Sequence, residues 1–172
     1  MHTLFAAIAG TVAVAFLTMP FVRHRYGTPA MASAQTELAR QGVRSTALHE
    51  NGMRFDASGH EWWAPGGFAA LMVVLAGMNL AELSWARPLN WVVLSLVLLA
   101  NCVIVYSNRT AEKSVRAAFV RKNDPELARI DVPALLRAAE DGFPDWTWKL
   151  QAVRNILVFG GTITGLLALA LS

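Results

Sequence analysis

The sequence contains a single cysteine, Cys102, among 172 residues. A disulfide scaffold or a cysteine-ligated zinc or iron–sulfur site needs several cysteines, so the sequence excludes these classes. Charged residues are also scarce, at 16% of the chain, whereas an ordinary soluble domain averages about 25%. The chain instead has abundant apolar side chains, since 55% of its residues are hydrophobic and its mean hydropathy is +0.39. This balance predicts an integral membrane protein, in which lipid receives much of the apolar surface.

Four apolar runs reach the length of about 18 residues that a helix needs to cross the hydrocarbon layer. They cover residues 4–22, 66–86, 89–107 and 152–171. Only Arg87 and Pro88 separate the second run from the third, so these two helices are expected to form a tight antiparallel hairpin. The predicted fold is all-α, a single four-helix membrane domain of residues 1–172 with two long connecting segments, 23–65 and 108–151.

The distribution of Lys and Arg predicts the orientation. Fourteen of the fifteen basic residues lie in the two long segments or at the exit of the second, and Arg87 alone lies elsewhere. Positively charged flanks stay on the cytoplasmic side, so both segments are predicted to be cytoplasmic and both termini to be outside. Each segment carries nearly as many acidic as basic residues, so the net charge of +3 is a topology signal, and no nucleic-acid partner is expected.

Both long segments are expected to contain helix. Residues 31–40 are good helix formers, and Gly42 is a suitable helix terminator. Asp131 is a candidate N-cap for a helix through Glu140, followed by Gly142 in the C′ position. Residues 109–122 lack Gly and Pro and can continue the third membrane helix, with one side offering contacts to lipid or to a partner. The basic residues on that side are Arg109, Lys113 and Arg116.

Glu82 is the clearest acidic residue within an apolar run, one turn before the predicted outer end of the second helix. A charged side chain in a membrane helix is costly and marks a functional hypothesis. Asn79 lies on the same face, and Asn90 or Ser95 is within reach across the hairpin. Glu82 is then a carboxylate that handles protons or cations, or a polar anchor for a partner helix. The alternative is a carboxylate near the interface that reaches water or pairs with Arg87.

Small residues recur on two of the apolar runs. Gly161 and Gly165 form a G-x-x-x-G pattern in the last run, and Gly10 belongs to a similar stripe in the first. Such faces allow close approach of helix backbones. They predict tight helix packing, either within the chain or against another membrane subunit or a second copy.

Residues 161–166, Gly-Thr-Ile-Thr-Gly-Leu, resemble the G-T-[VI]-x-G-L helix of the MotA/TolQ/ExbB proton-channel family. In that family the threonine-bearing helix lines an ion path beside a partner subunit, and a cytoplasmic helical domain precedes it. The resemblance implies that Thr162 is a pore-side hydroxyl and that residues 109–145 correspond to the cytoplasmic domain. That family has a further span after this helix, whereas this sequence stops at Ser172.

The four histidines lie outside the apolar runs, so no imidazole within a span is available as a haem ligand. His49, Asp56 and His60 fit no helical zinc motif, and we predict neither a metal nor another cofactor. The sequence also shows no nucleophile paired with a base, so no catalytic residue is predicted. A small membrane enzyme acting on a lipid or quinone would have to use these three residues.

The sequence therefore leads to a main hypothesis and two alternatives. The main one is a non-catalytic small subunit, or an assembly or accessory factor, of a larger membrane protein complex. The alternatives are an ion-conducting or motor-like subunit that uses Glu82, Asn79 and Thr162, and the small membrane enzyme. Few Lys beside many Arg and Ala suggests a GC-rich bacterial genome and hence the inner membrane.

Overall fold

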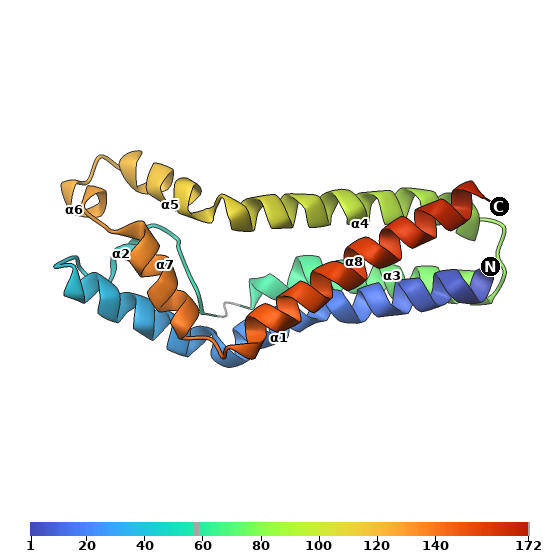
Figure 1. Ribbon diagram of the computed structural model, residues 1–172, viewed down its shortest axis with the longest axis horizontal. Helices are drawn as coiled ribbons and strands as arrows, with labels where there is room; N and C mark the ends of the chain where they lie inside the picture. The colour runs from blue at the N-terminus through green and yellow to red at the C-terminus, as the bar shows by residue number, and fades with distance from the viewer. Residues whose placement is uncertain (57–58, 172) are drawn as a thin grey trace. The chain divides into compact units, whose positions relative to one another are not determined.

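The computed structural model describes residues 1–56 and 59–171. Over these residues the chain is helical and has no β-strand (Figure 1), which confirms the all-α prediction. The elements are α1 (His2–Arg40), α2 (Ala47–Glu50), the 3-10 helix η1 (His60–Trp62), α3 (Trp63–Leu80), α4 (Ala86–Arg109), α5 (Ala111–Val120), α6 (Pro125–Ala128), α7 (Val132–Asp141) and α8 (Trp146–Ala170).

The described residues form two compact units. We call the first the four-helix unit; it comprises Met1–Phe21, Gly59–Val105 and Trp148–Ser172. The second, here called the small-helix unit, comprises Val22–Ser58 and Tyr106–Thr147. Helices α1, α4 and α8 contribute residues to both units. The two segments that the sequence analysis treated as connections therefore contain the residues of a second folded unit.

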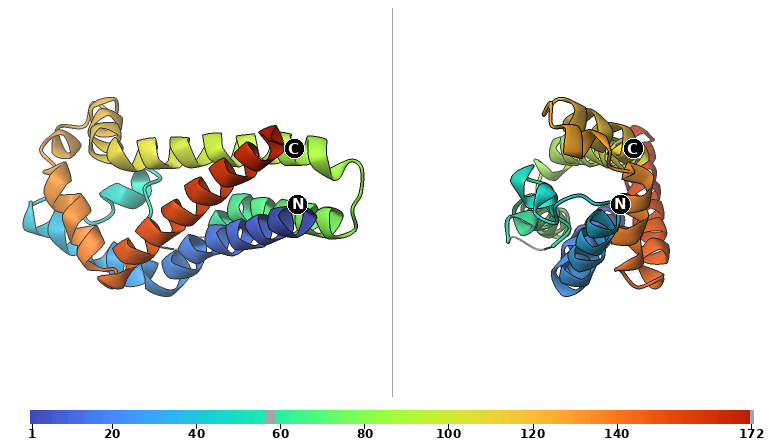
Figure 2. Two further views of the ribbon diagram at one scale, coloured as in Figure 1. Left: turned by 45° about the vertical axis from the view of Figure 1, so that its right-hand side comes forward. Right: turned by 90° about the vertical axis from the view of Figure 1, so that its left-hand side faces the viewer.

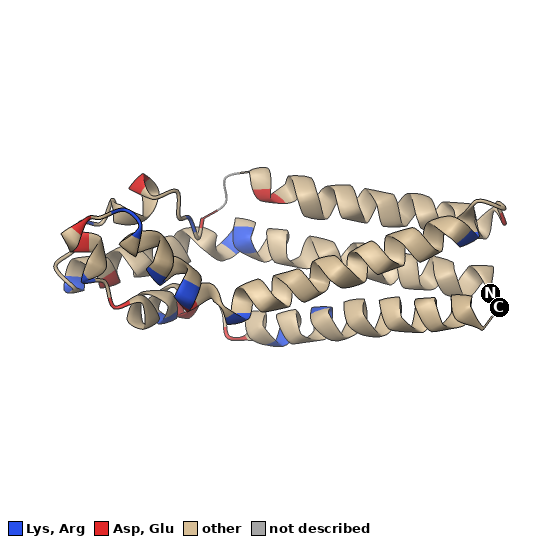
Figure 3. Cartoon of the chain, turned by 90° about the horizontal axis from the view of Figure 1, so that it is seen from above, with Lys and Arg blue, Asp and Glu red and all other residues tan. Residues whose placement is uncertain are grey.

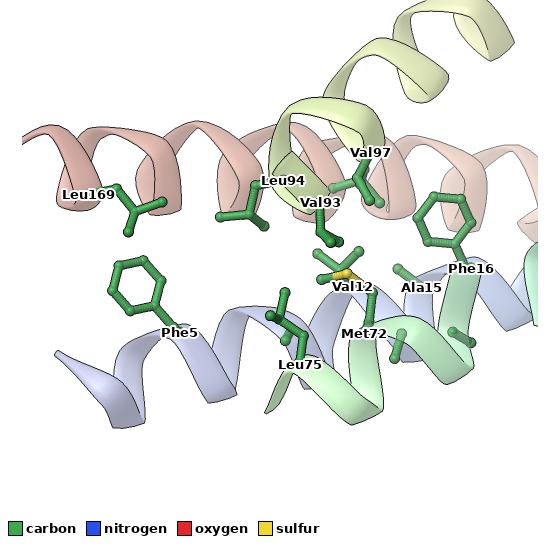
Figure 4. Close-up of a cluster of buried hydrophobic side chains, with 14 residues drawn as sticks. Phe5, Val12, Ala15, Phe16, Met72, Leu75, Val93, Leu94, Val97 and Leu169 are labelled. Atoms are coloured by element: carbon green, nitrogen blue, oxygen red, sulfur yellow. The ribbon is translucent and has the colours of Figure 1, made fainter. Parts of the chain in front are cut away.

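The four-helix unit contains four helices that are long and apolar enough to cross a membrane. Its core takes side chains from all four helices, and Figure 4 shows Phe5 and Val12 of α1 facing Leu94 of α4 and Leu169 of α8. Large apolar side chains also point outward, and Val73 of α3, for example, is 60% exposed. Figure 3 shows that these long helices carry few charged residues. An apolar outer surface of this kind is suited to lipid.

The α3–α4 connection lies earlier than the sequence indicated. Helix α3 ends at Leu80 and α4 begins at Ala86, so Arg87 and Pro88 belong to the first turn of α4. The end of α3 is a Schellman motif, in which the Leu83 amide donates to the Met78 carbonyl and the Glu82 amide donates to the Asn79 carbonyl. These hydrogen bonds end the helix although the sequence stays apolar beyond it, which hydropathy alone does not reveal.

Helix α1 is longer than the sequence predicted. We expected an apolar helix over residues 4–22 and a separate helix over 31–40, but one helix runs from His2 to Arg40. Its later part is retained because it packs in the small-helix unit, where Ala30, Ala34 and Leu38 are fully buried. Gly42 then ends the helix as predicted: its φ is +70°, and the Val43 amide donates to the Leu38 carbonyl.

The small-helix unit has a hydrophobic core of its own. Figure 2 shows its short helices from two further sides. Residues from α1, α2, α5, α6 and α7 contribute to this core. Its buried members are Met31, Ala34, Leu38, Val43, Ala47, Leu48, Phe119, Leu127, Ile130, Val132, Leu135 and Ala139. Asp131 is the N-cap of α7, as predicted, since its side chain accepts a hydrogen bond from the Ala134 amide. The two chain segments thus fold together rather than as independent loops.

Two glycines in this unit allow very close backbone contacts. A Cβ added at Gly142 would lie 2.3 Å from the Ala30 Cα, and one at Gly27 would lie 2.6 Å from the Phe55 carbonyl oxygen. Gly142 follows the end of α7, as the sequence indicated, but its φ of −75° is not left-handed. Glycine is therefore required here because there is no space for a Cβ, and not because the backbone is left-handed as at a C′ residue.

Candidate functional site

A pair of buried asparagines links α3 to α4 in the four-helix unit. Asn79 is 1% exposed and Asn90 is 2% exposed. The Asn90 Nδ2 donates to the Asn79 Oδ1 at 2.8 Å, and the Asn79 Nδ2 donates to the Asn90 Oδ1 at 3.2 Å. The Asn79 Nδ2 also donates to the Leu75 carbonyl at 2.7 Å. The two side-chain amides therefore satisfy each other across the hairpin, a common way to hold membrane helices together.

Replacing Asn79 by leucine should destabilise the four-helix unit by about 1–3 kcal/mol, because it leaves the Asn90 amide buried without its partner. The double variant Asn79→Leu/Asn90→Leu should lose less than the sum of the two single variants, because no unpaired amide remains. Thermal unfolding of the four proteins in detergent measures this coupling. Asn108→Leu, at an exposed position of α4, is the control. Strictly additive losses would show that the two amides are not energetically coupled.

The structure places Glu82 outside the membrane-length helices. It is an exposed residue of the α3–α4 turn, with a φ of +53°. The Glu82 backbone amide donates to the Asn79 carbonyl. The Asn79 side chain is hydrogen-bonded to Asn90 instead. A cavity of about 200 Å³ lies beside this asparagine pair, and Arg87 and His2 are among its lining residues, whereas Glu82 is not. The structure thus brings Asn79 to a cavity but does not bring the Glu82 carboxylate there.

Thr162 lies on the buried face of α8. It is fully buried, and its hydroxyl donates to the Val158 carbonyl of the same helix at 2.6 Å. Gly165 packs closely, since an added Cβ would lie 2.7 Å from the Leu94 Cδ1, whereas one at Gly161 would make ordinary contacts with Ile8 and Val12. A Cβ at Gly10 would meet nothing within 4 Å. Of the three predicted packing glycines, Gly165 is therefore the one in a tight helix contact.

The same buried face of α8 contains Arg154, which the sequence does not mark as a site residue. Arg154 is one of the basic residues at the exit of the second long segment, but it is 5% exposed within the four-helix unit. Helical spacing from Gly165 through Thr162 and Val158 leads directly to Arg154. Extending the small-residue face toward the start of the helix would have identified it.

Arg44 joins the two chain segments of the small-helix unit. Its Nη2 donates to the Asp124 Oδ2 at 2.6 Å, its Nε donates to the Glu50 Oε2 at 2.8 Å, and its Nη1 donates to the Glu126 Oε2. The Glu126 Oε1 also accepts from the Arg44 backbone amide at 2.6 Å. The guanidinium and the Glu126 backbone amide together hold the pKa of Asp124 below its usual range. One arginine thus organises three carboxylates that are up to 82 residues away in sequence.

This network predicts a pH dependence of the small-helix unit. Asp124 binds its proton more weakly in the folded chain than when unfolded, so its contribution is complete above about pH 4 and is lost as the pH falls through the lowered pKa. Amide hydrogen exchange of residues 124–142 against pH should show this loss of protection. Arg44→Gln should weaken the dependence, whereas Arg116→Gln, which removes an exposed pair with Glu112, should retain it. An unchanged profile in Arg44→Gln would contradict the assignment.

An exposed face at the end of α4 and along α5 combines basic and apolar side chains. It lines a shallow depression of about 810 Å³ in the small-helix unit. We define the α5 surface by its large side chains, Tyr106, Lys113, Arg116, Val120 and Arg121. Tyr106 is 70% exposed and Val120 is 61% exposed. Lys113 and Arg116 therefore share a face, as predicted from their spacing, whereas Arg109 does not line this depression.

The histidine and acidic residues considered for an enzyme or metal site do not all belong to the same unit. His49 is exposed in α2, and the Asp56 carboxylate accepts from Arg54, which lowers the pKa of Asp56. His60 begins η1, in the four-helix unit. Within residues 1–56 and 59–171, no three His, Cys, Asp or Glu side chains are grouped to hold a metal ion.

No protein-family model, curated protein or solved structure matches this chain. Its function is therefore inferred from the geometry of its own residues.

Proposed function

We propose that this chain is a non-catalytic accessory subunit, or an assembly factor, of a larger membrane protein complex. Its four apolar helices anchor it in the bilayer, and its small-helix unit docks another subunit through the α5 surface. The arginine and lysine distribution supports a topology with both termini outside and the small-helix unit in the cytoplasm. The low lysine and high arginine content supports a bacterial inner membrane.

The observation that carries this proposal is the exposure of large apolar side chains beside three basic residues on a folded unit. Tyr106 and Val120 are solvated in the isolated chain, although the other side of α5 buries Phe119 in the core. Aromatic residues and arginine are enriched where proteins bind one another. The partner that fits is an acidic segment with apolar side chains, because Lys113, Arg116 and Arg121 supply the complementary charge.

The proposal is tested by purifying the native protein from membranes in mild detergent and measuring the mass of the assembly. We expect a complex that contains a second polypeptide in fixed stoichiometry, crosslinked by a photoreactive residue at position 120. The triple variant Lys113→Glu/Arg116→Glu/Arg121→Glu should lose that polypeptide. The control is Arg137→Glu, an exposed position of α7 outside the α5 surface, which should retain it.

Three outcomes would overturn the proposal. One is a monomer without any associated polypeptide in the native purification. Another is retention of the partner by the triple variant at the level of the control. The third is crosslinking of position 120 only to a second copy of this chain, which would identify a homo-oligomer instead.

A further inference from the structure

Arg154 is a buried cation in the four-helix unit, and no carboxylate among the described residues serves as its counter-ion. Its Nη1 donates to the Asn155 Oδ1 at 3.2 Å, and its Cζ lies 5.6 Å from the centroid of the Phe16 ring. Its Nε has no hydrogen-bond partner among the described residues, and no carboxylate there forms a salt bridge with it. Burying a charge in this way is unfavourable unless an anion accompanies it.

Arg154 lines a groove between α1 and α8. The groove has a volume of about 270 Å³, and Val14 and Thr18 of α1 line it opposite Val153 and Leu157 of α8. Val14 is 67% exposed, Val153 is 51% exposed and Leu157 is 41% exposed, so the groove opens on the outer surface of the unit. An occupant must therefore offer apolar groups to these walls and an anionic group to Arg154.

We propose that this groove binds an anionic phospholipid, with its phosphate on the Arg154 guanidinium and an acyl chain along the apolar walls. The planar guanidinium presents its donors in a fork that matches phosphate oxygens. Trp148, at the start of α8, is 44% exposed, as is usual for aromatic residues at the headgroup level. Arg154 lies six residues further, about 9 Å along the helix axis, and arginine side chains extend toward the headgroups.

This site is independent of the docking proposed above. Every residue that lines the groove belongs to the four-helix unit, whereas the α5 surface belongs to the small-helix unit. Loss of the partner subunit would leave the lipid site intact, and loss of the lipid site would leave the α5 surface intact. The two proposals therefore fail separately.

Native mass spectrometry of the full-length protein, delipidated in detergent, tests the proposal with two probe lipids. Phosphatidylglycerol should bind about tenfold or more tightly than phosphatidylcholine, because the choline cation of phosphatidylcholine lies next to its phosphate and repels the Arg154 guanidinium, whereas phosphatidylglycerol carries no cation. Arg154→Gln should abolish this preference and Arg154→Lys should retain part of it. Arg109→Gln, which removes an exposed arginine of α4 from the other unit, should bind as the unmodified protein does.

A second variant separates the groove from the charge. Val14→Trp fills the groove at an exposed position while Arg154 remains, and it should weaken binding of both lipids. It also keeps the test decisive if Arg154→Gln does not fold. Undiminished phosphatidylglycerol binding by either variant would overturn the proposal. Displacement of the lipid by inorganic phosphate alone would also overturn it, because the site would then bind free phosphate.

Discussion

Replacing Phe119 by alanine is expected to cost the small-helix unit about 3–5 kcal/mol of its free energy of unfolding. Phe119 on α5 is 2% exposed and packs in the cluster that includes Leu38 of α1 and Leu135 of α7. Truncating it removes apolar contacts within this cluster and leaves a cavity there. This is the largest effect we expect from a single substitution, because Phe119 is the largest fully buried side chain among the described residues.

Hydrogen exchange of the full-length protein in detergent measures this loss. Amides in α6 and α7 should exchange faster in Phe119→Ala, whereas amides in the four-helix unit should keep their protection if the two units unfold separately. Val120→Ala is the matched control, since Val120 follows in the same helix but is 61% exposed. Surface changes of this kind usually alter stability by less than about 0.5 kcal/mol. Equal exchange in the two variants would show that the core does not stabilise the unit.

Replacing Gly142 by alanine should destabilise the same unit by about 1–3 kcal/mol or more, because the added Cβ overlaps the backbone. The new atom would lie 2.3 Å from the Ala30 Cα and 2.7 Å from the Ala30 nitrogen. Neither atom belongs to a flexible side chain, so α1 and the end of α7 must move apart. The cost therefore arises from helix separation and not from backbone strain at position 142.

Gly160→Ala provides the control for the Gly142 variant. Gly160 lies within α8, and a Cβ there would meet nothing within 4 Å. Alanine is the better helix former by about 0.8–1.0 kcal/mol, so this variant should be as stable as the unmodified protein or more stable. Thermal unfolding and limited proteolysis of both variants make the comparison. A Gly142→Ala protein as stable as Gly160→Ala would contradict the close contact.

Local sequence patterns predicted the individual elements well. The four long apolar runs indicated the four membrane-length helices, because lipid tolerates uninterrupted apolar helix and little else. Gly42 and Asp131 marked a helix end and a helix start, since capping depends on a few neighbouring residues. The short α3–α4 connection was also evident, although hydropathy placed it several residues late because Glu82 ends α3 through backbone hydrogen bonds.

Residues that depend on distant parts of the chain were less evident. Arg44 meets Asp124 and Glu126 about 80 residues away, and nothing near Arg44 in the sequence indicates those partners. Helical spacing places Asn79 on the same face as Glu82, but its amide pairs with Asn90 across the hairpin. Its position near a helix end makes Arg154 a topology signal in the sequence, yet its Cζ lies 5.6 Å from the centroid of the Phe16 ring.

The sequence by itself determined the class of this protein, an all-helical chain with four membrane-length apolar helices. These properties follow from the length and the apolar composition of each continuous segment. Only the tertiary structure decided that the two intervening segments fold into a second unit with its own core. It also decided that Arg154, which has no counter-ion among the described residues, lines an apolar groove. Both results depend on contacts between side chains far apart in sequence, and such contacts are set by packing and charge pairing rather than by local pattern.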